Sequence, residues 1–371
     1  MIRVRFLKEK KHMVRFKIAS IVMLCIPLMV SAGTAEKLGS LPAGVSPDSV
    51  DFTATEMYVL ARGTISVYSL PDLVLRRTFC GPGGGAGLLS PRHQWDQTVR
   101  IAGDKVLAED NNKIILFSLD GRLLEEKPKP ENTVWIVPFG KGYIAKNMIV
   151  TGDPALQVIR LVLLDPGLRE IKEIYRQKWF QQLTPKGFET EFPGDLLHFA
   201  VAGDLVFVEK SPEGSTVGIF NAEGREIASA HPAGAPIPMT PVDREEILAR
   251  LRLEKRVETM IARTGSWEKL REMWSHVFTD FKPALREIQA YGDAVLARTF
   301  KQEGDEAGFL LIDARGRVRK EIVLPVGTDA ETEARVCGTA FFKIIGGRVY
   351  FLKSGSVPGV WDVYTATAAG L

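Results

Sequence analysis

Histidine, a common residue at metal and acid-base sites, is scarce in this sequence, at 5 of 371 residues. A metal site needs several donors at once, because together they must replace the water lost by the ion. There is no HExxH motif and no aspartate-rich loop, and outside the N-terminal segment the only histidines are His93, His198, His231 and His276. We therefore expect no metal and no cofactor, while an active site assembled from distant parts of the chain stays open.

Motifs of nucleophilic catalysis and of nucleotide binding are also lacking. No GxSxG elbow is present, and no serine or cysteine can be tied to a histidine base from the sequence. GxxxxGK[ST] and a GxGxxG that opens a helix are missing too. The sequence identifies no catalytic residue, so we expect a binding protein rather than an enzyme.

Cysteine is nearly as rare, with three residues. Cys25 lies within an apolar N-terminal run, and the residues before it, Val22-Met23-Leu24, lack the small side chain usual before a lipidated cysteine. Cys80 and Cys337 remain. In an oxidising compartment these two can form a disulfide, and the alternative is a pair of buried thiols.

Excess charge is small and is concentrated at the start of the chain. The formal net charge is +3, yet seven basic residues fall within the first 17 positions: Arg3, Arg5, Lys8, Lys10, Lys11, Arg15 and Lys17. The remaining chain is near neutral, which speaks against nucleic acid as a partner. At 45% hydrophobic and 25% charged residues, the composition is that of a folded globular protein.

The N-terminus has the three-part pattern of a secretory signal peptide, predicted over residues 1–35. The basic stretch is followed by the apolar run Ile18 to Val30 and then by small residues, with cleavage expected after Ala32 or Ala35. The run is shorter than the roughly 20 apolar residues that span a bilayer. We expect a periplasmic or secreted protein that begins at Met1 or Met13, with membrane attachment only if the segment stays uncleaved.

A short apolar hairpin recurs along the rest of the chain. Five copies consist of two apolar segments joined by a glycine turn, and the first copy has Ala54-Thr55-Glu56 in place of the glycine. The copies are VDFTATEMYVLAR (50–62), VRIAGDKVLAE (99–109), IVPFGKGYIAK (136–146), FAVAGDLVFVE (199–209), IQAYGDAVLAR (288–298) and FKIIGGRVYFLK (342–353). Apolar β-branched runs split by Gly-Asp or Gly-Gly indicate β-hairpins.

A second hairpin follows each of the first five copies. It combines an apolar strand, a turn with Asp or Asn and usually Gly, and a more polar strand: ISVYSLPDLVLRRTF (65–79), IILFSLDGRLLEE (114–126), IRLVLLDPGLREIKEI (159–174), VGIFNAEGREIAS (217–229) and FLLIDARGRVRKEIVL (309–324). Two linked hairpins form a four-stranded antiparallel sheet whose polar fourth strand lies at the rim. Six such repeats predict radial repetition around an axis.

The last repeat is incomplete, and the start of the predicted mature chain completes it. After VWDVYTAT (360–367) no fourth strand follows. Residues 36–44 (EKLGSLPAG) resemble the fourth-strand endings REIASAHPAG (225–234) and KEIVLPVG (320–327). We predict that residues 36–44 supply the outer strand of the last sheet and close the ring, because closure removes exposed sheet edges.

Three features resemble the six-bladed propellers of the NHL/TolB-like kind: the repeats, the glycine-rich stretch Gly81 to Gly85, and the Phe281-Lys282-Pro283 segment before the fifth repeat. The resemblance implies an all-β fold over residues 36–371, a six-bladed β-propeller closed by its N-terminal strand. Members of such families include binding modules and metal-dependent hydrolases and lyases, so the likeness implies an architecture more than a chemistry.

Two segments interrupt the repeat. Residues 176–195 are expected to form a long loop over one face. Residues 240–280, between blades 4 and 5, are predicted as two helices: Thr240 and Pro241 open the first, Gly265 ends it, and Ser266 caps the second. Packing against the side of the propeller is one role for the helices, and a lid or partner-binding role is the other.

Candidate binding residues lie where each second strand ends in a charge, at Arg62, Glu109, Lys146, Glu209, Arg298 and Lys353. The alternating signs suggest salt bridges between adjacent blades. The alternation fails at Arg298, Lys353 and Arg62, and these three positive charges on neighbouring blades are a candidate site for a small anionic ligand. The alternative is a solvated ring of charges.

A second candidate is the loop over residues 81–97, which carries Arg92, His93 and Trp95 on glycine-rich backbone. Loops of this kind often hold binding residues, so these three are predicted to line the mouth of the propeller. The function expected is therefore an exported, non-catalytic module that binds a protein, a glycan or a small anionic ligand. The alternative, which the family resemblance supplies, is a metal-dependent hydrolase or lyase with its site in the central channel.

Overall fold

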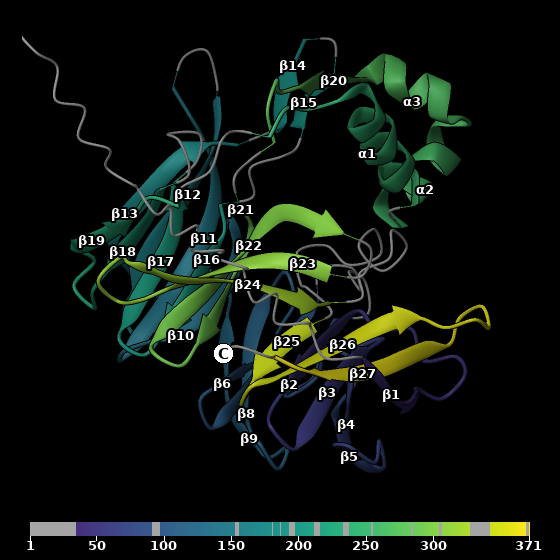
Figure 1. The fold of residues 1–371 in the computed structure, drawn as a ribbon, viewed down its shortest axis with the longest axis vertical. Coiled ribbons are helices and arrows are strands. Elements are labelled where there is room, and N and C mark those ends of the chain that lie inside the picture. The colour runs from purple at the N-terminus through teal and green to yellow at the C-terminus, as the bar shows by residue number, and fades with distance from the viewer. Residues whose placement is uncertain are drawn as a thin grey trace, which may run out of the picture. The chain divides into compact units, whose positions relative to one another are not determined.

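A computed structural model describes residues 35–371 except 91–96, 153–155, 180, 186, 193–196, 211–215, 233–236, 254, 283–284, 304–305, 327–341 and 369–370. Nearly all of the predicted signal peptide therefore lies outside the described residues. In the part of the chain that is described, strands dominate. They form six four-stranded sheets and one three-stranded sheet (Figure 1).

The four-stranded sheets are numbered in chain order of their first strands. Sheet 1 contains β2 (Ser49–Phe52), β3 (Glu56–Ala61), β4 (Thr64–Ser69) and β5 (Leu75–Cys80). Sheet 2 contains β6 (Thr98–Ala102), β7 (Lys105–Glu109), β8 (Lys113–Ser118) and β9 (Leu123–Pro128). Sheet 3 contains β10 (Thr133–Phe139), β11 (Gly142–Thr151), β12 (Leu156–Leu164) and β13 (Glu170–Lys178).

The other three sheets repeat this order. Sheet 4 contains β16 (Phe199–Ala202), β17 (Leu205–Lys210), β18 (Thr216–Phe220) and β19 (Glu226–Ala230). Sheet 5 contains β21 (Leu285–Tyr291), β22 (Ala294–Glu303), β23 (Glu306–Ile312) and β24 (Val318–Pro325). Sheet 6 contains β25 (Phe342–Ile345), β26 (Arg348–Ser354), β27 (Trp361–Thr367) and, at its outer edge, β1 (Glu36–Ser40).

The pairing of β1 with β27 confirms the predicted outer strand of the last sheet over the first five residues of the 36–44 segment. The strands are antiparallel, with Glu36 opposite Thr365 and Ser40 opposite Asp362. Ser40 Oγ donates a hydrogen bond to Asp362 Oδ1 at 2.6 Å, and Lys37 Nζ lies 2.8 Å from Asp362 Oδ2. In Figure 1 the N-terminal strand, in purple, lies beside the C-terminal strands, in yellow.

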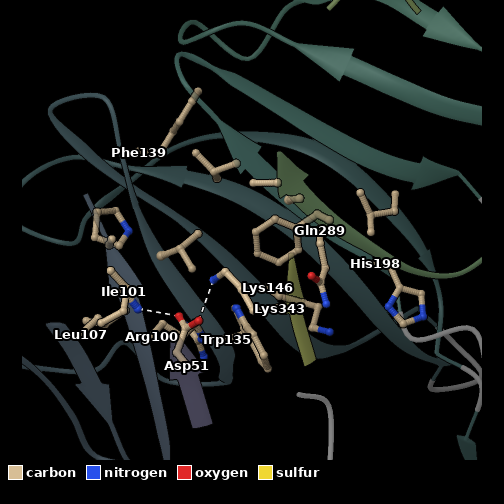
Figure 2. A pocket seen from close by; sticks show the side chains of 18 of the residues that line it. Asp51, Arg100, Ile101, Leu107, Trp135, Phe139, Lys146, His198, Gln289 and Lys343 are labelled. Carbon is tan, nitrogen blue, oxygen red and sulfur yellow. Dashed lines mark hydrogen bonds and ion pairs between the residues drawn. The ribbon is translucent and has the colours of Figure 1, made fainter. Parts of the chain in front are cut away.

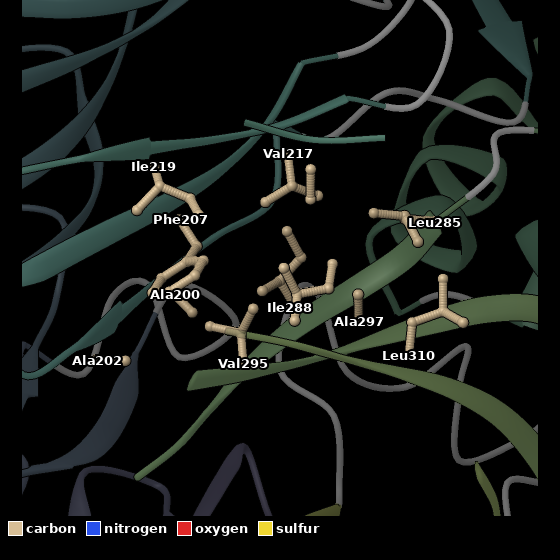
Figure 3. Close-up of a cluster of buried hydrophobic side chains, with 12 residues drawn as sticks. Ala200, Ala202, Phe207, Val217, Ile219, Leu285, Ile288, Val295, Ala297 and Leu310 are labelled. Carbon is tan, nitrogen blue, oxygen red and sulfur yellow. The ribbon is translucent and has the colours of Figure 1, made fainter. Parts of the chain in front are cut away.

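The hydrophobic core is divided among six clusters, each of which joins two consecutive sheets. The cluster between sheets 4 and 5 brings Phe207 and Ile219 against Ile288 and Leu310 (Figure 3). Equivalent clusters join sheets 1 and 2, 2 and 3, 3 and 4, and 5 and 6, and a sixth joins sheet 6 back to sheet 1. The fold is therefore an all-β, propeller-like repeat in which each sheet is covered on both faces.

Strand alternation explains how one sheet serves two clusters. Successive side chains of a strand point to opposite faces. On β22, Val295 and Ala297 pack toward sheet 4, whereas Leu296 packs toward sheet 6. This is why the inner strands are apolar at consecutive positions, while the fourth strands, such as β9, are largely exposed and polar.

The turns with Asp or Asn and Gly place glycine against the neighbouring sheet. In the β23–β24 turn, the Asp313 carboxylate accepts hydrogen bonds from the backbone N–H groups of Arg315 and Arg317. Gly316 follows with a φ of +75°, and a Cβ atom there would lie 2.4 Å from the Ser229 backbone oxygen of sheet 4. Glycine is therefore required at this turn both by its backbone angle and by the close approach of two sheets.

The two interruptions of the repeat form one insertion, which corrects two expectations. Residues 176–195 are not a loop throughout, because β14 (Gln181–Thr184) and β15 (Gly187–Phe192) form a hairpin. The segment 240–280 contains three helices and a strand: α1 (Pro241–Leu253), α2 (Lys255–Thr264), α3 (Trp267–Met273) and β20 (Trp274–Phe278). β20 pairs in parallel with β15, from Phe188 opposite Trp274 to Phe192 opposite Phe278.

The insertion has a core of its own. Phe192 packs with Leu251, Val257, Trp267 and Trp274 from the helical segment. The Trp274 indole N–H donates a hydrogen bond to Thr190 Oγ1 at 2.5 Å. The helix ends follow the prediction: α1 begins at Pro241, Gly265 follows α2 with a φ of +91°, and Ser266 caps α3 by accepting from the Lys269 N–H. Only the pairing of two distant segments makes β14, β15 and β20 a sheet.

We expect Gly316→Ala to lower the free energy of unfolding by about 2–4 kcal/mol, from the left-handed φ together with the clash against Ser229. Gly292→Ala is the matched control, because Gly292 has a φ of +62° but no atom within 4 Å of an added Cβ. The control should lose only about 1 kcal/mol. Equal losses in urea unfolding would contradict the close approach of sheets 4 and 5.

Deletion of residues 36–40 should lower the melting temperature and cause self-association, because β27 becomes an exposed edge strand. Calorimetry and light scattering on the chain from residue 36 onward, with and without the five residues, measure both effects. The control is Ser40→Ala, which removes one hydrogen bond and should cost about 1 kcal/mol. If the deleted chain melts like its parent and stays monomeric, β1 does not complete sheet 6.

Candidate functional site

A central cavity of about 580 Å³ is lined by the first strands of all six four-stranded sheets (Figure 2). Each of β2, β6, β10, β16, β21 and β25 contributes residues to its wall. The wall combines apolar and aromatic groups with a few charged ones. A cavity of this size and lining is typical of a binding site for a small molecule.

The side chains that line the cavity include one position that recurs in every repeat. The second residue of the aligned hairpin lies in the wall in all six copies: Asp51, Arg100, Val137, Ala200, Gln289 and Lys343. Four of these six residues are polar. That recurring position is the sequence signal that could have identified the cavity.

One arc of the wall, made by sheets 6, 1 and 2, is held together by Asp51. Its Oδ1 accepts from Lys343 Nζ at 2.7 Å and from the Phe52 N–H at 2.8 Å, while Oδ2 accepts from the Ile101 N–H at 2.7 Å. Asp51 is 7% exposed. A single carboxylate therefore links the first strands of three sheets, across the junction where the chain's last repeat meets its first.

Sheets 2 and 3 are joined by Arg100. Its guanidinium lies 3.6 Å from the centroid of the Trp135 ring and donates to the Ile136 carbonyl oxygen at 2.6 Å. It also forms an ion pair with the buried Glu109, whose other carboxylate oxygen lies 3.1 Å from Lys129 Nζ. Burial would raise the pKa of Glu109, but these two cations outweigh burial and hold it below its ordinary value. Two cations and one carboxylate leave this cluster with a net positive charge.

The arc opposite Asp51, made by sheets 3, 4 and 5, includes a histidine. His198 lies just before β16, half-buried in the cavity wall. Burial and then the charges of Lys146 and Arg286 lower its pKa to about 3. The imidazole is therefore neutral near pH 7.

The predicted anionic site at Arg62, Arg298 and Lys353 does not coincide with the cavity, because none of these three described residues lies among those that line it. Arg62 is exposed in the β3–β4 turn with a φ of +51°. Arg298 is 4% exposed, with its guanidinium 5.6 Å from the Phe342 ring centroid, and Lys353 is half-buried on β26. The three differ widely in exposure, and the ligand role stays a prediction.

Glu109 does not form the predicted salt bridge with the second-strand end of a neighbouring sheet. It pairs with Arg100 and Lys129 instead. Burial explains the difference: Glu109 and Glu209 are 1% and 2% exposed, so they are not part of a solvated ring. Lys146, in contrast, does line the cavity.

Some of the predicted binding and disulfide residues lie outside the described residues. Arg92, His93 and Trp95 lie outside the described residues, and the described part of the same loop packs inward through Leu89, which is fully buried between sheets 1 and 2. Cys80 ends β5 as a half-buried residue whose thiol pKa is raised by burial. Cys337 lies outside the described residues, so the disulfide stays a prediction.

Among the described residues, no three His, Cys, Asp or Glu side chains are grouped so that they could hold a metal ion. Between residues 35 and 371, as far as the structure describes them, no helix is both long and apolar enough to cross a membrane.

Comparison with known proteins finds no matching protein family and no matching curated protein. Among solved structures, the Neurospora crassa Pan2 WD40 domain is similar at 9% identity and a TM-score of 0.42, over 93% of this chain and 99% of that chain. BamB from Moraxella catarrhalis gives 9% and 0.31, over 86% and 84%, and Kluyveromyces lactis Hsv2 gives 8% and 0.37, over 86% and 97%. Similarity this low carries no inference about what the chain binds.

Asp51→Asn should lower the free energy of unfolding by about 2–4 kcal/mol, because it leaves the partly buried Lys343 without its counter-charge. Asp104→Asn, at an exposed position in the β6–β7 turn, is the control and should change it by less than about 0.5 kcal/mol. Urea unfolding of both variants tests this. A small loss in both would show that Asp51 does not hold the junction together.

Proposed function

We propose that the chain is an exported six-bladed β-propeller, of the NHL/TolB-like kind, that binds its ligand without catalysis in the central cavity. The six four-stranded sheets are the blades, and the three-stranded sheet belongs to the insertion between them. Two observations support six blades. Each of six hydrophobic clusters is shared by two consecutive sheets, and each of the six sheets contributes its first strand to the cavity wall.

Export rests on the signal-peptide pattern of residues 1–35. Cleavage after Ala35 leaves β1 whole, because that strand begins at Glu36. The mature chain then starts with the strand that completes the last blade. Mass spectrometry of the protein recovered from outside the cytoplasm identifies the first residue, and a start beyond Ser40 contradicts this closure.

The observation that carries the binding function is the cavity itself. About 580 Å³ is enough for a small molecule, or for one group of a glycan or protein partner. Its wall offers aromatic surface at Trp135 and Phe139, together with polar groups fixed on strands rather than on loops. Rigid strands hold such groups in place before the ligand arrives, which reduces the entropy lost on binding.

A thermal-shift screen of the mature chain with neutral and anionic small molecules tests the cavity as the binding site. Ala290 is exposed and lines the cavity, so Ala290→Trp should fill part of it and abolish binding of a hit. Ala222→Trp, at an exposed turn between β18 and β19, is the matched control and should bind normally. Molecules that still bind the Ala290→Trp variant place the ligand elsewhere.

A stoichiometric divalent ion in the purified protein would overturn the non-catalytic function in favour of a metal-dependent hydrolase or lyase.

A further inference from the structure

The recurring position in the cavity wall is polar in four neighbouring sheets and apolar in the other two. Sheets 5, 6, 1 and 2 place polar side chains there, and sheets 3 and 4 place apolar ones. In that order the residues are Gln289, Lys343, Asp51, Arg100, Val137 and Ala200. A ligand that matches this wall therefore has a polar side and an apolar side.

On the polar side, Gln289 has a buried acceptor that no described residue pairs. Its Nε2 donates to Glu287 Oε1 at 2.8 Å and to the Phe342 carbonyl oxygen at 3.2 Å, and these two contacts set the orientation of the amide. Its Oε1 is buried and accepts no hydrogen bond from the described residues. A buried acceptor without a donor costs free energy, so a ligand that donates to this oxygen gains an interaction that the free protein lacks.

The Gln289 amide is placed to present that oxygen to the cavity. The residue is half-buried and lines the wall, and Figure 2 shows its side chain between the Asp51–Lys343 contact and His198. The terminal torsion of a glutamine side chain is soft. A small rotation therefore turns Oε1 toward a ligand while the strand stays in place.

A hydrogen-bond donor lies on the next sheet. Lys343 directly follows Phe342, the residue that accepts from Gln289, and its side chain lines the cavity and is 31% exposed. An ammonium group carries three N–H donors, and Asp51 Oδ1 accepts one of them at 2.7 Å. The remaining donors can serve a ligand next to Gln289.

This combination of donor and acceptor selects among ligand groups. An oxyanion accepts hydrogen bonds but donates none, so it leaves Gln289 Oε1 unpaired, and an ammonium group would lie beside the like charge of Lys343. A hydroxyl group both donates and accepts. The charges in the wall are also of both signs, which favours a neutral ligand. They belong to Asp51, Glu287, Arg100, Lys146 and Lys343.

We infer that the cavity recognises the hydroxyl groups of a neutral sugar, either free or as one unit of a glycan. One hydroxyl donates to Gln289 Oε1, and the same or an adjacent hydroxyl accepts from Lys343 Nζ. The C–H surface of the sugar ring packs against the apolar side at Val137 and Ala200. The sugar site rests on the proposed binding function, and it differs from the sequence-based site at Arg62, Arg298 and Lys353.

NMR of the mature protein tests the site with glucose, galactose, mannose and N-acetylglucosamine, each against tetrahydropyran, which has the ring but no hydroxyl group. The Gln289 side-chain amide signals are assigned by their loss in Gln289→Leu. We expect saturable shifts of these signals with at least one sugar and none with tetrahydropyran. No shift with any of the sugars, or equal shifts with tetrahydropyran, overturns the site.

The methyl glycoside of the sugar that binds separates the two sources. Equal affinity for the glycoside fits one unit of a glycan, because the linking oxygen is then tolerated. Loss of binding fits a free sugar.

Gln289→Leu should weaken binding of that sugar roughly 5- to 10-fold, because the acceptor is removed. Gln97→Leu is the matched control. Gln97 Nε2 also donates to a backbone carbonyl oxygen, that of Ser90 at 2.6 Å, and its buried Oε1 also has no partner among the described residues. Gln97 does not line the cavity, so the control should bind as the parent does. Equal affinity in the two variants would remove Gln289 from the site.

The screen for cavity ligands separates the sugar site from the binding function on which it rests. Molecules without hydroxyl groups that bind and are blocked by Ala290→Trp, with no response of Gln289 to any sugar, leave the binding function standing and overturn the sugar site. The absence of any cavity ligand overturns both.

Discussion

Closure of the series of sheets is the constraint on which the rest of the structure depends. Sheet 6 obtains its outer strand from residues 36–40, more than 300 positions before its partner strand, and Asp51 links the first strands on either side of the same junction. Without these contacts, sheets 6 and 1 would each expose an apolar face, and β27 would be an open edge. The cavity exists because six first strands are held around it.

This constraint also explains the sequence pattern of the blades. Since each sheet is covered on both faces, consecutive residues of an inner strand are apolar, whereas four of the six recurring positions in the cavity wall are polar. Polar residues can occupy those positions at little cost to packing. Asp51 and Lys343 use this freedom to stabilise the junction.

Four features were predictable, because each rests on local alternation and turn chemistry: the repeat, its four-strand unit, the polar rim and the N-terminal closing strand. The turn at Asp313 and Gly316 forms as its sequence indicates. The strands of the insertion were not predictable, because β15 and β20 become a sheet only by pairing across more than 80 residues. The burial of Glu109 and Arg298 was also missed, since a charge at a strand end gives no local sign of its exposure.

The sequence by itself determined the number of repeats, the order of strands within each, and which segment completes the last one, because these follow from residue-to-residue patterns along the chain. Only the tertiary structure decided which charged groups meet. Asp51 of sheet 1 faces Lys343 of sheet 6, and Arg100 of sheet 2 lies against the Trp135 ring of sheet 3, because strands from different repeats converge on one cavity. Such convergence depends on the register and packing of whole sheets, which no single segment encodes.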